Sequence, residues 1–352
     1  MSSAEYSALM VKPSANKPQT KLQTPTQIVI VTPALADANN GNWQTAKRWQ
    51  QFLAPLYPTR LVKAWPDDDA ATADVAMIAL HARRSADSIA AWHAARGPEK
   101  LAVVLTGTDL YRDIQIDAAA QRSLQLAGML VVLQELGAAA LPASVRDKAR
   151  VIFQSTRSRQ PVAKPADRLR AVMVGHLRAE KSPDTLFVAA RLLASHPGIL
   201  IDHIGVALDP ALGDAAQATM AEVHNYRWLG GLTHQDTRNR IQRAHVLVHC
   251  SRMEGGAHVV MEAVASGTPV LASRIDGNVG MLGADYAGYF PPGDAAALAK
   301  LLLRCDESRR SQDGASLLQT LSRQCALRAP LFEPAAERAA VRRLALNLIE
   351  AG

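Results

Sequence analysis

Short apolar segments alternate with longer amphipathic ones along nearly the whole chain, and this alternation limits the fold more than any other feature. The apolar segments are almost continuously hydrophobic, which is typical of strands buried on both faces of a parallel sheet. We expect strands at 28–32, 61–64, 75–80, 101–106, 129–133, 151–154, 171–174, 200–204, 226–229, 246–249 and 270–272. We expect helices at 42–56, 182–194, 210–224, 234–243, 255–266, 294–305, 315–325 and 332–349. The pattern predicts an α/β protein with two Rossmann-like, doubly wound domains facing each other across a cleft.

The boundary between the two domains is expected at a polar segment with two prolines, "TRSRQPVAKPADR" at 156–168. We therefore predict a disordered tail over 1–26, an N-terminal Rossmann-like domain over 27–160 and a C-terminal Rossmann-like domain over 161–330. The last segment, 331–352, reads as an amphipathic helix that could pack back on the N-terminal domain.

Composition argues against several classes of protein. The chain has 39 basic and 32 acidic residues, but the charges are scattered and aromatic residues make up only 5%, which disfavours nucleic-acid binding. No apolar run approaches the roughly 18 residues of a membrane span. The three cysteines, Cys250, Cys305 and Cys325, are too widely spaced for a disulfide framework or a zinc motif. We expect a cytoplasmic protein without stable membrane association, and we interpret Asp67–Asp69 as a solvated turn and not a metal site.

Two glutamates, Glu254 and Glu262, flank Gly255-Gly256 and an apolar run, and this stretch is the strongest candidate site. We expect the glycines at a helix start, where an anion can approach unpaired backbone N–H groups. Glu262 lies eight positions beyond Glu254, which corresponds to about 12 Å along a helix. This spacing suits a ligand with hydroxyls at both ends and an anion between them, although a solvated helix face would show the same spacing.

The stretch "VLVHCSRMEGGAHVVMEAVASGTPVLAS" resembles the Glu-x7-Glu motif of retaining GT-B glycosyltransferases of the family-4 type. The resemblance implies that Glu254 holds the sugar of a nucleotide-sugar donor and Glu262 the ribose. It also implies donor contacts from Gly255, Gly256, Ala257 and His258. Many members have Phe-Gly where this chain has Gly256-Ala257, so its contacts with the sugar should differ.

A second stretch, "VGHLRAEKSPDTLFVAARLL", is similar to the family's Gly-x-Leu…Lys segment after the first strand of the second domain. By this similarity Arg178 and Lys181 would neutralise the donor diphosphate and assist its departure, although both residues could also be ordinary surface cations. Ser182 stands where the family usually has glycine. Thr233, which follows Gly230-Gly231, is the candidate for the nucleobase pocket.

Polar residues follow several strands of the first half, where a doubly wound fold opens its cleft. The segment Asn40, Gly41 and Asn42 could bind an anion, or could be a plain loop with Asn42 as a helix cap. Cationic, hydroxyl and carboxylate side chains at two further strand ends favour a small anionic acceptor. These candidates are His81, Arg83, Arg84, Thr108, Asp109 and Arg112, with His81 as a possible catalytic group.

Three stretches narrow the resemblance to the selenosugar synthases of selenoneine biosynthesis: "NNGNWQTAKRW", "LTGTDLYRDI" and "RIDGNVGMLGADYAGYF". This resemblance implies that UDP-N-acetylglucosamine or UDP-glucose reacts with selenophosphate, giving a 1-selenosugar and UDP without a metal or other cofactor. Three alternatives stay open: a UDP-sugar transferase for another small acceptor, a non-catalytic nucleotide-sugar-binding protein and a GT-B epimerase.

Overall fold

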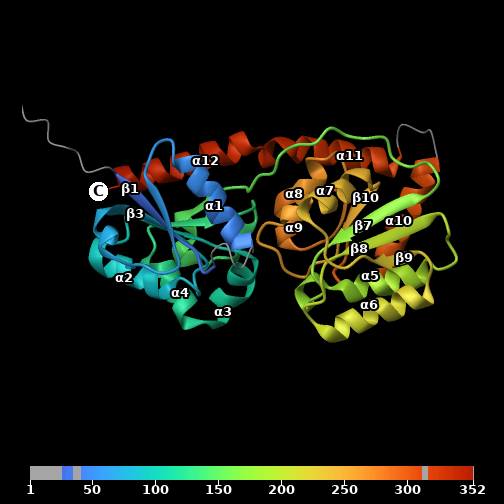
Figure 1. Ribbon diagram of the computed structural model, residues 1–352, viewed down its shortest axis with the longest axis horizontal. Coiled ribbons are helices and arrows are strands. Elements are labelled where there is room, and N and C mark those ends of the chain that lie inside the picture. Colours follow the sequence, from blue (N-terminus) through green and yellow to red (C-terminus); the bar gives the residue numbers. More distant parts are fainter. Residues whose placement is uncertain (1–25, 35–40, 311–315, 352) are drawn as a thin grey trace, which may run out of the picture.

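The computed structural model describes residues 26–34, 41–310 and 316–351, which form two α/β halves side by side (Figure 1). Each half contains a six-stranded sheet in which every strand pair is parallel. The first sheet has the order β2-β1-β3-β4-β5-β6 and the second β12-β11-β10-β7-β8-β9. The predicted fold class, two doubly wound parallel-sheet domains, is therefore confirmed. The predicted tail over 1–26 lies, apart from Thr26, outside the described residues.

The strands follow the apolar segments of the sequence. Those of the first sheet are β1 (Gln27–Val31), β2 (Thr59–Val62), β3 (Asp74–Leu80), β4 (Leu101–Val104), β5 (Met129–Val132) and β6 (Ala149–Val151). Those of the second sheet are β7 (Leu169–Val174), β8 (Ile199–Ile204), β9 (Tyr226–Trp228), β10 (Val246–His249), β11 (Val270–Ser273) and β12 (Tyr289–Phe290). The sixth strand begins and ends earlier than the predicted 151–154, and the two-residue β12 was not predicted.

Helices cover both faces of each sheet, as a sheet of apolar parallel strands requires. In the first half they are α1 (Gly41–Leu53), α2 (Ala86–Arg96), α3 (Ile114–Ile116) and α4 (Ala118–Leu126). In the second half they are α5 (Pro183–Leu192), α6 (Pro210–Glu222), α7 (His234–Arg243), α8 (His258–Val264), α9 (Asp276–Leu282), α10 (Ala295–Arg310) and α11 (Leu317–Arg328). No described helix combines the length and the apolar character needed to cross a bilayer.

The last helix, α12 (Pro334–Glu350), returns from the second half and packs on the first (Figure 1). Its apolar side chains Val341 and Leu344 join a core cluster with Ile28 of β1 and with Trp49 and Leu53 of α1. Fully burying a side chain such as Leu or Ile stabilises a fold by about 1.5–3 kcal/mol. The chain thus passes twice between the halves, once after β6 and once before α12, and both passages border the cleft.

Candidate functional site

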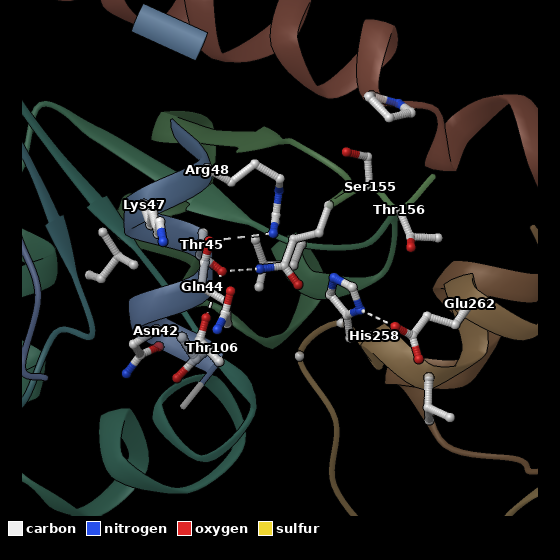
Figure 2. A pocket seen from close by; sticks show the side chains of 18 of the residues that line it. Asn42, Gln44, Thr45, Lys47, Arg48, Thr106, Ser155, Thr156, His258 and Glu262 are labelled. Carbon is white, nitrogen blue, oxygen red and sulfur yellow. Dashed lines mark hydrogen bonds and ion pairs between the residues drawn. The ribbon is translucent and has the colours of Figure 1, made fainter. Parts of the chain in front are cut away.

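A cavity of about 1060 Å³ lies between the two halves and is lined by residues from both. Leu80, Val104 and Val174 line it at the carboxyl ends of β3, β4 and β7, which is where doubly wound sheets bind ligands. Figure 2 shows the polar side chains of α1 facing His258 and Glu262 across this space. The volume is of the order found for sites that hold drug-sized ligands.

Glu262 lies on α8 and lines the cavity, although its side chain is largely buried. Its Oε1 lies 2.7 Å from Nε2 of His234, 3.6 Å from Nδ1 of His258 and 3.8 Å from Nη1 of Arg238. Burial alone would raise the pKa of Glu262, but His258, His234 and Arg238 together outweigh it and hold the pKa below its usual value. Glu262 is therefore a carboxylate, and its closest partner, His234, is 76% exposed and free to move away.

Arg238 was not predicted from the sequence, yet it is only 4% exposed and contacts the chain where it crosses between the halves. It donates from Nη1 to Thr156 Oγ1 at 2.7 Å and from Nη2 to the Arg157 carbonyl at 3.0 Å. Burial lowers the pKa of Arg238, and Glu262 partly counteracts this effect. The guanidinium thus links Glu262 to the crossover segment 155–157.

Glu254 forms the centre of a second charged group beside the cleft. Its carboxylate pairs with the ammonium of Lys181 and lies 3.4 Å from Nε2 of His249. Burial would raise the pKa of Glu254, but the Lys181 charge and His249 hold it well below its usual range. Lys181, predicted to face the diphosphate, is therefore engaged with Glu254. Arg178, in contrast, is half-exposed and lies 3.9 Å from Glu180.

The loop that carries Glu254 touches the N-terminal half directly. A Cβ on Gly107 would lie 2.7 Å from the backbone nitrogen of Gly255, so these two loops approach each other too closely for any side chain. A Cβ on Gly277 of α9 would likewise overlap the backbone oxygen of Glu254. Gly277 belongs to "RIDGNVGMLGADYAGYF", one of the three stretches that resemble selenosugar synthases. Its close approach to Glu254 means that α9 packs directly against the loop that carries this glutamate.

The predicted helix start at Gly255-Gly256 is wrong. Both glycines lie in a loop, and α8 begins at His258 after Ala257, whose N–H points at Sδ of Met281 at 3.1 Å. The chain first follows the surface of the N-terminal half, where a Cβ on Gly256 would lie 2.9 Å from Leu133 Cβ, and only then turns into the helix. The glutamates therefore do not share one helix, although Gly255, Gly256 and His258 do line the cavity.

Thr233, predicted in a nucleobase pocket, caps α7 instead. Its hydroxyl accepts a hydrogen bond from the Asp236 N–H at 3.1 Å and bonds the Asp236 carboxylate at 2.7 Å. It does not line the cavity, whereas His234 and Thr237 of the same helix do. The structure thus places the Thr233 hydroxyl in a helix cap, and its contact with a nucleobase stays a prediction.

The predicted acceptor residues divide into two groups. Gly41 and Asn42 line the cavity at the start of α1, and Asn40 lies outside the described residues. None of the others is among the residues that line the cavity: His81, Arg83, Arg84, Thr108, Asp109 and Arg112. Thr108 immediately precedes a short π-helix over Asp109–Asp113.

The second group forms a network of its own at the carboxyl ends of β3 and β4. Asp109 is fully buried, accepts from the Ala82 N–H at 2.7 Å and lies 3.1 Å from Nδ1 of His81. Arg83 donates to Asp113 at 3.0 Å, and Arg112 donates to the other oxygen of the same carboxylate at 3.1 Å. Four of the six side chains, those of His81, Arg83, Asp109 and Arg112, therefore bond within this network and not toward the cavity.

Two clusters of acidic side chains in the first half, at 109–113 and at 67–69, are candidates for a metal site. The ligand atoms of His81, Asp109 and Asp113 lie within 4.8 Å of one another, but two arginines and a backbone N–H already occupy the carboxylates. The turn at Asp67–Asp69 is held by Arg60, which donates to Asp67 at 2.8 Å. This ion pair lowers the pKa of Asp67, so the turn is anchored and not simply solvated.

A buried carboxylate on α12, Glu337, joins three elements at the edge of the cleft. It accepts from Arg48 at 2.7 and 2.9 Å, from Nε1 of Trp49 at 2.7 Å, and from the N–H and hydroxyl of Ser155 at 2.9 and 2.6 Å. Its exposure is 1%, so the carboxylate depends entirely on these donors. We call Glu337, Arg48, Trp49 and Ser155 the Glu337 junction.

Comparisons with known proteins agree with this architecture. Residues 154–313 match the model of the family "Glycosyl transferases group 1". The chain is 26% identical over 144 residues, 40% of its length, to glycosyltransferase 1 domain-containing protein 1 of Xenopus tropicalis, and the match spans only 41% of that relative.

Solved structures resemble nearly the whole chain. Sucrose-phosphate synthase from Thermosynechococcus elongatus is 17% identical and superimposes with a TM-score of 0.73, over 93% of this chain and 100% of that one. HepE from Anabaena, solved with UDP and glucose, is 14% identical with a TM-score of 0.67, over 91% and 99% of the two chains. A glycosyltransferase from Rickettsia africae is 12% identical with a TM-score of 0.72, over 94% and 100%. The protein has the GT-B fold, and its C-terminal half matches the group 1 glycosyltransferases.

Proposed function

We propose that this protein is a UDP-sugar-dependent glycosyltransferase. The observation that carries the proposal is the placement of Glu262 in the interdomain cavity, in the half that matches the group 1 family. The paired residues Glu254 and Lys181 belong to the same half, and Gly255, which follows Glu254, lines the cavity. The HepE structure with UDP and glucose supports a uridine nucleotide as the donor. Glu262 in the cavity and Glu254, which directly precedes the cavity-lining Gly255, are both kept ionised, and ionised carboxylates suit hydroxyl groups as ligands because each oxygen is a hydrogen-bond acceptor.

In this proposal the ribose hydroxyls replace His234 as donors to Glu262. The replacement requires little rearrangement, because His234 is exposed while Glu262 is held by its helix. Glu254 accepts from a sugar hydroxyl, and the Lys181 ammonium remains close enough to stabilise charge on the departing diphosphate. His176, which lines the cavity, stays neutral near pH 7 because burial and then the charges of Arg178 and Lys181 lower its pKa.

We further propose selenophosphate as the acceptor, following the resemblance to selenosugar synthases. Selenium attacks the anomeric carbon with its electron pair, the bond from that carbon to the diphosphate oxygen breaks, and UDP leaves with the bonding pair. Water then cleaves the selenium–phosphorus bond, giving phosphate and the 1-selenosugar. The nucleophile is already anionic, so no strong general base is needed. Cationic side chains supply the positive charge, and we expect the reaction to need no metal.

The charge of the cavity lining supports an anionic acceptor. Among the described residues that line it, Glu262 is the only Asp or Glu, against one lysine, three arginines and three histidines. An acceptor alcohol would instead require a base, for which the three histidines of the lining would be the candidates. His81 and Asp109, two of the candidates that the sequence indicated in the first domain, lie 3.1 Å apart and do not line the cavity.

Incubation of the purified protein with UDP-N-acetylglucosamine or UDP-glucose and selenophosphate tests the proposal. We expect UDP release that depends on selenophosphate, and a product with an anomeric carbon–selenium bond by ⁷⁷Se NMR. Glu262→Gln should raise the KM for the donor, whereas Glu307→Gln, an exposed carboxylate on α10, should leave it unchanged.

Three results would point to the alternatives. UDP release with other acceptors but not with selenophosphate would indicate a transferase for another acceptor. Binding of UDP-sugar without turnover would indicate a non-catalytic protein. Conversion of the donor without any acceptor would indicate an epimerase.

A further inference from the structure

Three cationic side chains line the cavity and form no ion pair with a carboxylate of the described residues. Lys47 lies on α1, Arg157 on the crossover segment and Arg338 on α12, and all three are exposed to the cavity or to solvent. Among the described residues none of the three forms an ion pair with Asp or Glu, and Lys47 contacts only the ring of Trp43, at 5.9 Å. Three separate elements thus contribute uncompensated positive charge to the lining of one cavity, and we call Lys47, Arg157 and Arg338 together the cationic wall.

The Glu337 junction fixes where this charge lies. Lys47 precedes Arg48 in the sequence and Arg338 follows Glu337, so two of the three cations are adjacent to residues of the junction. Arg157 follows Ser155 by two positions, and its carbonyl is held by Arg238. Because the junction carboxylate is buried and accepts five hydrogen bonds, the backbones that carry the three cations are held in fixed relative positions.

The charge balance of the wall is positive. Arg48 also lines the cavity, but Glu337 compensates its charge in a two-bond ion pair. The charges of Lys47, Arg157 and Arg338 have no such compensation, and cations gathered at a concave surface attract a small anion more strongly than isolated cations do. Figure 2 shows α1, which carries Lys47, on one side of the cavity and Glu262 on the other. Arg157 follows Thr156, which Arg238 connects to the Glu262 side.

We propose that the cationic wall is the binding site for the phosphoryl group of the acceptor, with Lys47, Arg157 and Arg338 as its ligands. The site differs from the acceptor residues that the sequence indicated, since Arg83 and Arg112 are bonded to Asp113. Arginine suits the role because its guanidinium can donate two parallel hydrogen bonds to one phosphoryl group. The identity of the acceptor rests on the proposed function, but the anion site itself does not.

Inorganic phosphate is a probe that separates the two proposals. Its affinity is measured by calorimetry with the wild type, Arg157→Gln and Arg338→Gln, each saturated with UDP. The matched control is Arg343→Gln, which removes the same charge from an exposed position of α12 outside the cavity lining. We expect each of the two test variants to weaken phosphate binding about tenfold, equivalent to about 1.4 kcal/mol. The control should keep wild-type affinity, and UDP affinity should stay within about twofold in all variants.

Unchanged phosphate affinity in both test variants would overturn the site. An equal loss of UDP affinity would also overturn it, because the wall would then bind the donor diphosphate. If phosphate binding depends on the two arginines but no selenosugar forms, the site stands and the proposed acceptor is wrong. If the selenosugar forms with an unchanged acceptor KM in both variants, the proposed function stands and the site is wrong.

Discussion

Lys181→Met tests the ion pair at the centre of the donor side. The substitution keeps most of the side-chain volume but removes the ammonium, so the Glu254 carboxylate, 12% exposed, keeps only His249 nearby. Removing one partner of a fully buried pair costs about 3–5 kcal/mol, and the 18% exposure of Lys181 reduces the expected loss to about 2–3 kcal/mol. For a domain of this size the melting temperature should fall by roughly 5–10 °C.

The loss of stability in Lys181→Met should depend on pH. In the wild type the folded-state pKa of Glu254 lies below its usual value, so the pair stabilises the protein above the unfolded pKa and loses this effect as pH falls. In Lys181→Met burial dominates and should raise the pKa of Glu254, so the deficit should be largest near pH 7 and shrink on acidification. Thermal melting between pH 5 and 8 measures this difference.

A double substitution provides the control. Lys181→Met/Glu254→Gln leaves no buried charge without a partner, and it should recover most of the lost stability while remaining inactive. A melting temperature for Lys181→Met equal to that of the wild type across this pH range would refute the reasoning, since the carboxylate would then not depend on the ammonium.

Three further perturbations test other parts of the site. Gly107→Ala places a methyl group 2.7 Å from the Gly255 nitrogen and should lower turnover roughly 10- to 100-fold by holding the halves apart, with a nearly unchanged melting temperature; full activity would show that this contact is dispensable. Glu337→Gln removes the charge that compensates Arg48 and should cost roughly 3 kcal/mol of stability in denaturant unfolding; a loss below about 1 kcal/mol would contradict the junction's role. Because the pKa of Glu262 is lowered, donor affinity should stay constant as pH falls towards 4.5 and decrease only below it; a decline already between pH 7 and 6 would contradict an ionised Glu262.

Much of the fold could be predicted because buried parallel strands appear in the sequence as short, almost continuously apolar segments. The predicted bounds of β10 and α7 agree with the structure to the residue. Four helices of the described chain, α2, α3, α4 and α9, were not predicted. The sequence of α9, "DGNVGML", contains two glycines and resembles a loop, but those glycines let the helix pack against both halves of the protein.

The site could be predicted where its residues are neighbours in sequence and not where they meet through folding. Glu254 and Glu262 belong to one local motif, so the sequence locates them. The pair between Lys181 and Glu254 joins positions 73 apart, and its existence depends on how β7 and β10 lie in the sheet.

Two other residues show the same limit. Arg238 stands in the highly polar helix sequence "HQDTRNRIQR", which gives no sign that the crossover segment covers it. Glu337 belongs to a helix with many charges, and only the return of α12 to the first half buries it. Sequence patterns report which face of an element is apolar, and a single polar residue buried by a distant segment leaves no periodic signal.

A crystal structure with UDP and the donor sugar would show directly whether Glu262 and Glu254 hold the two ends of a UDP-sugar. In this structure the ribose hydroxyls should lie within hydrogen-bond distance of the Glu262 carboxylate, and His234 should be displaced. The sugar should lie beside Glu254, and its anomeric carbon should face the cationic wall. A nucleotide bound with its ribose away from Glu262, or with its diphosphate on Arg157 and Arg338, would contradict this assignment.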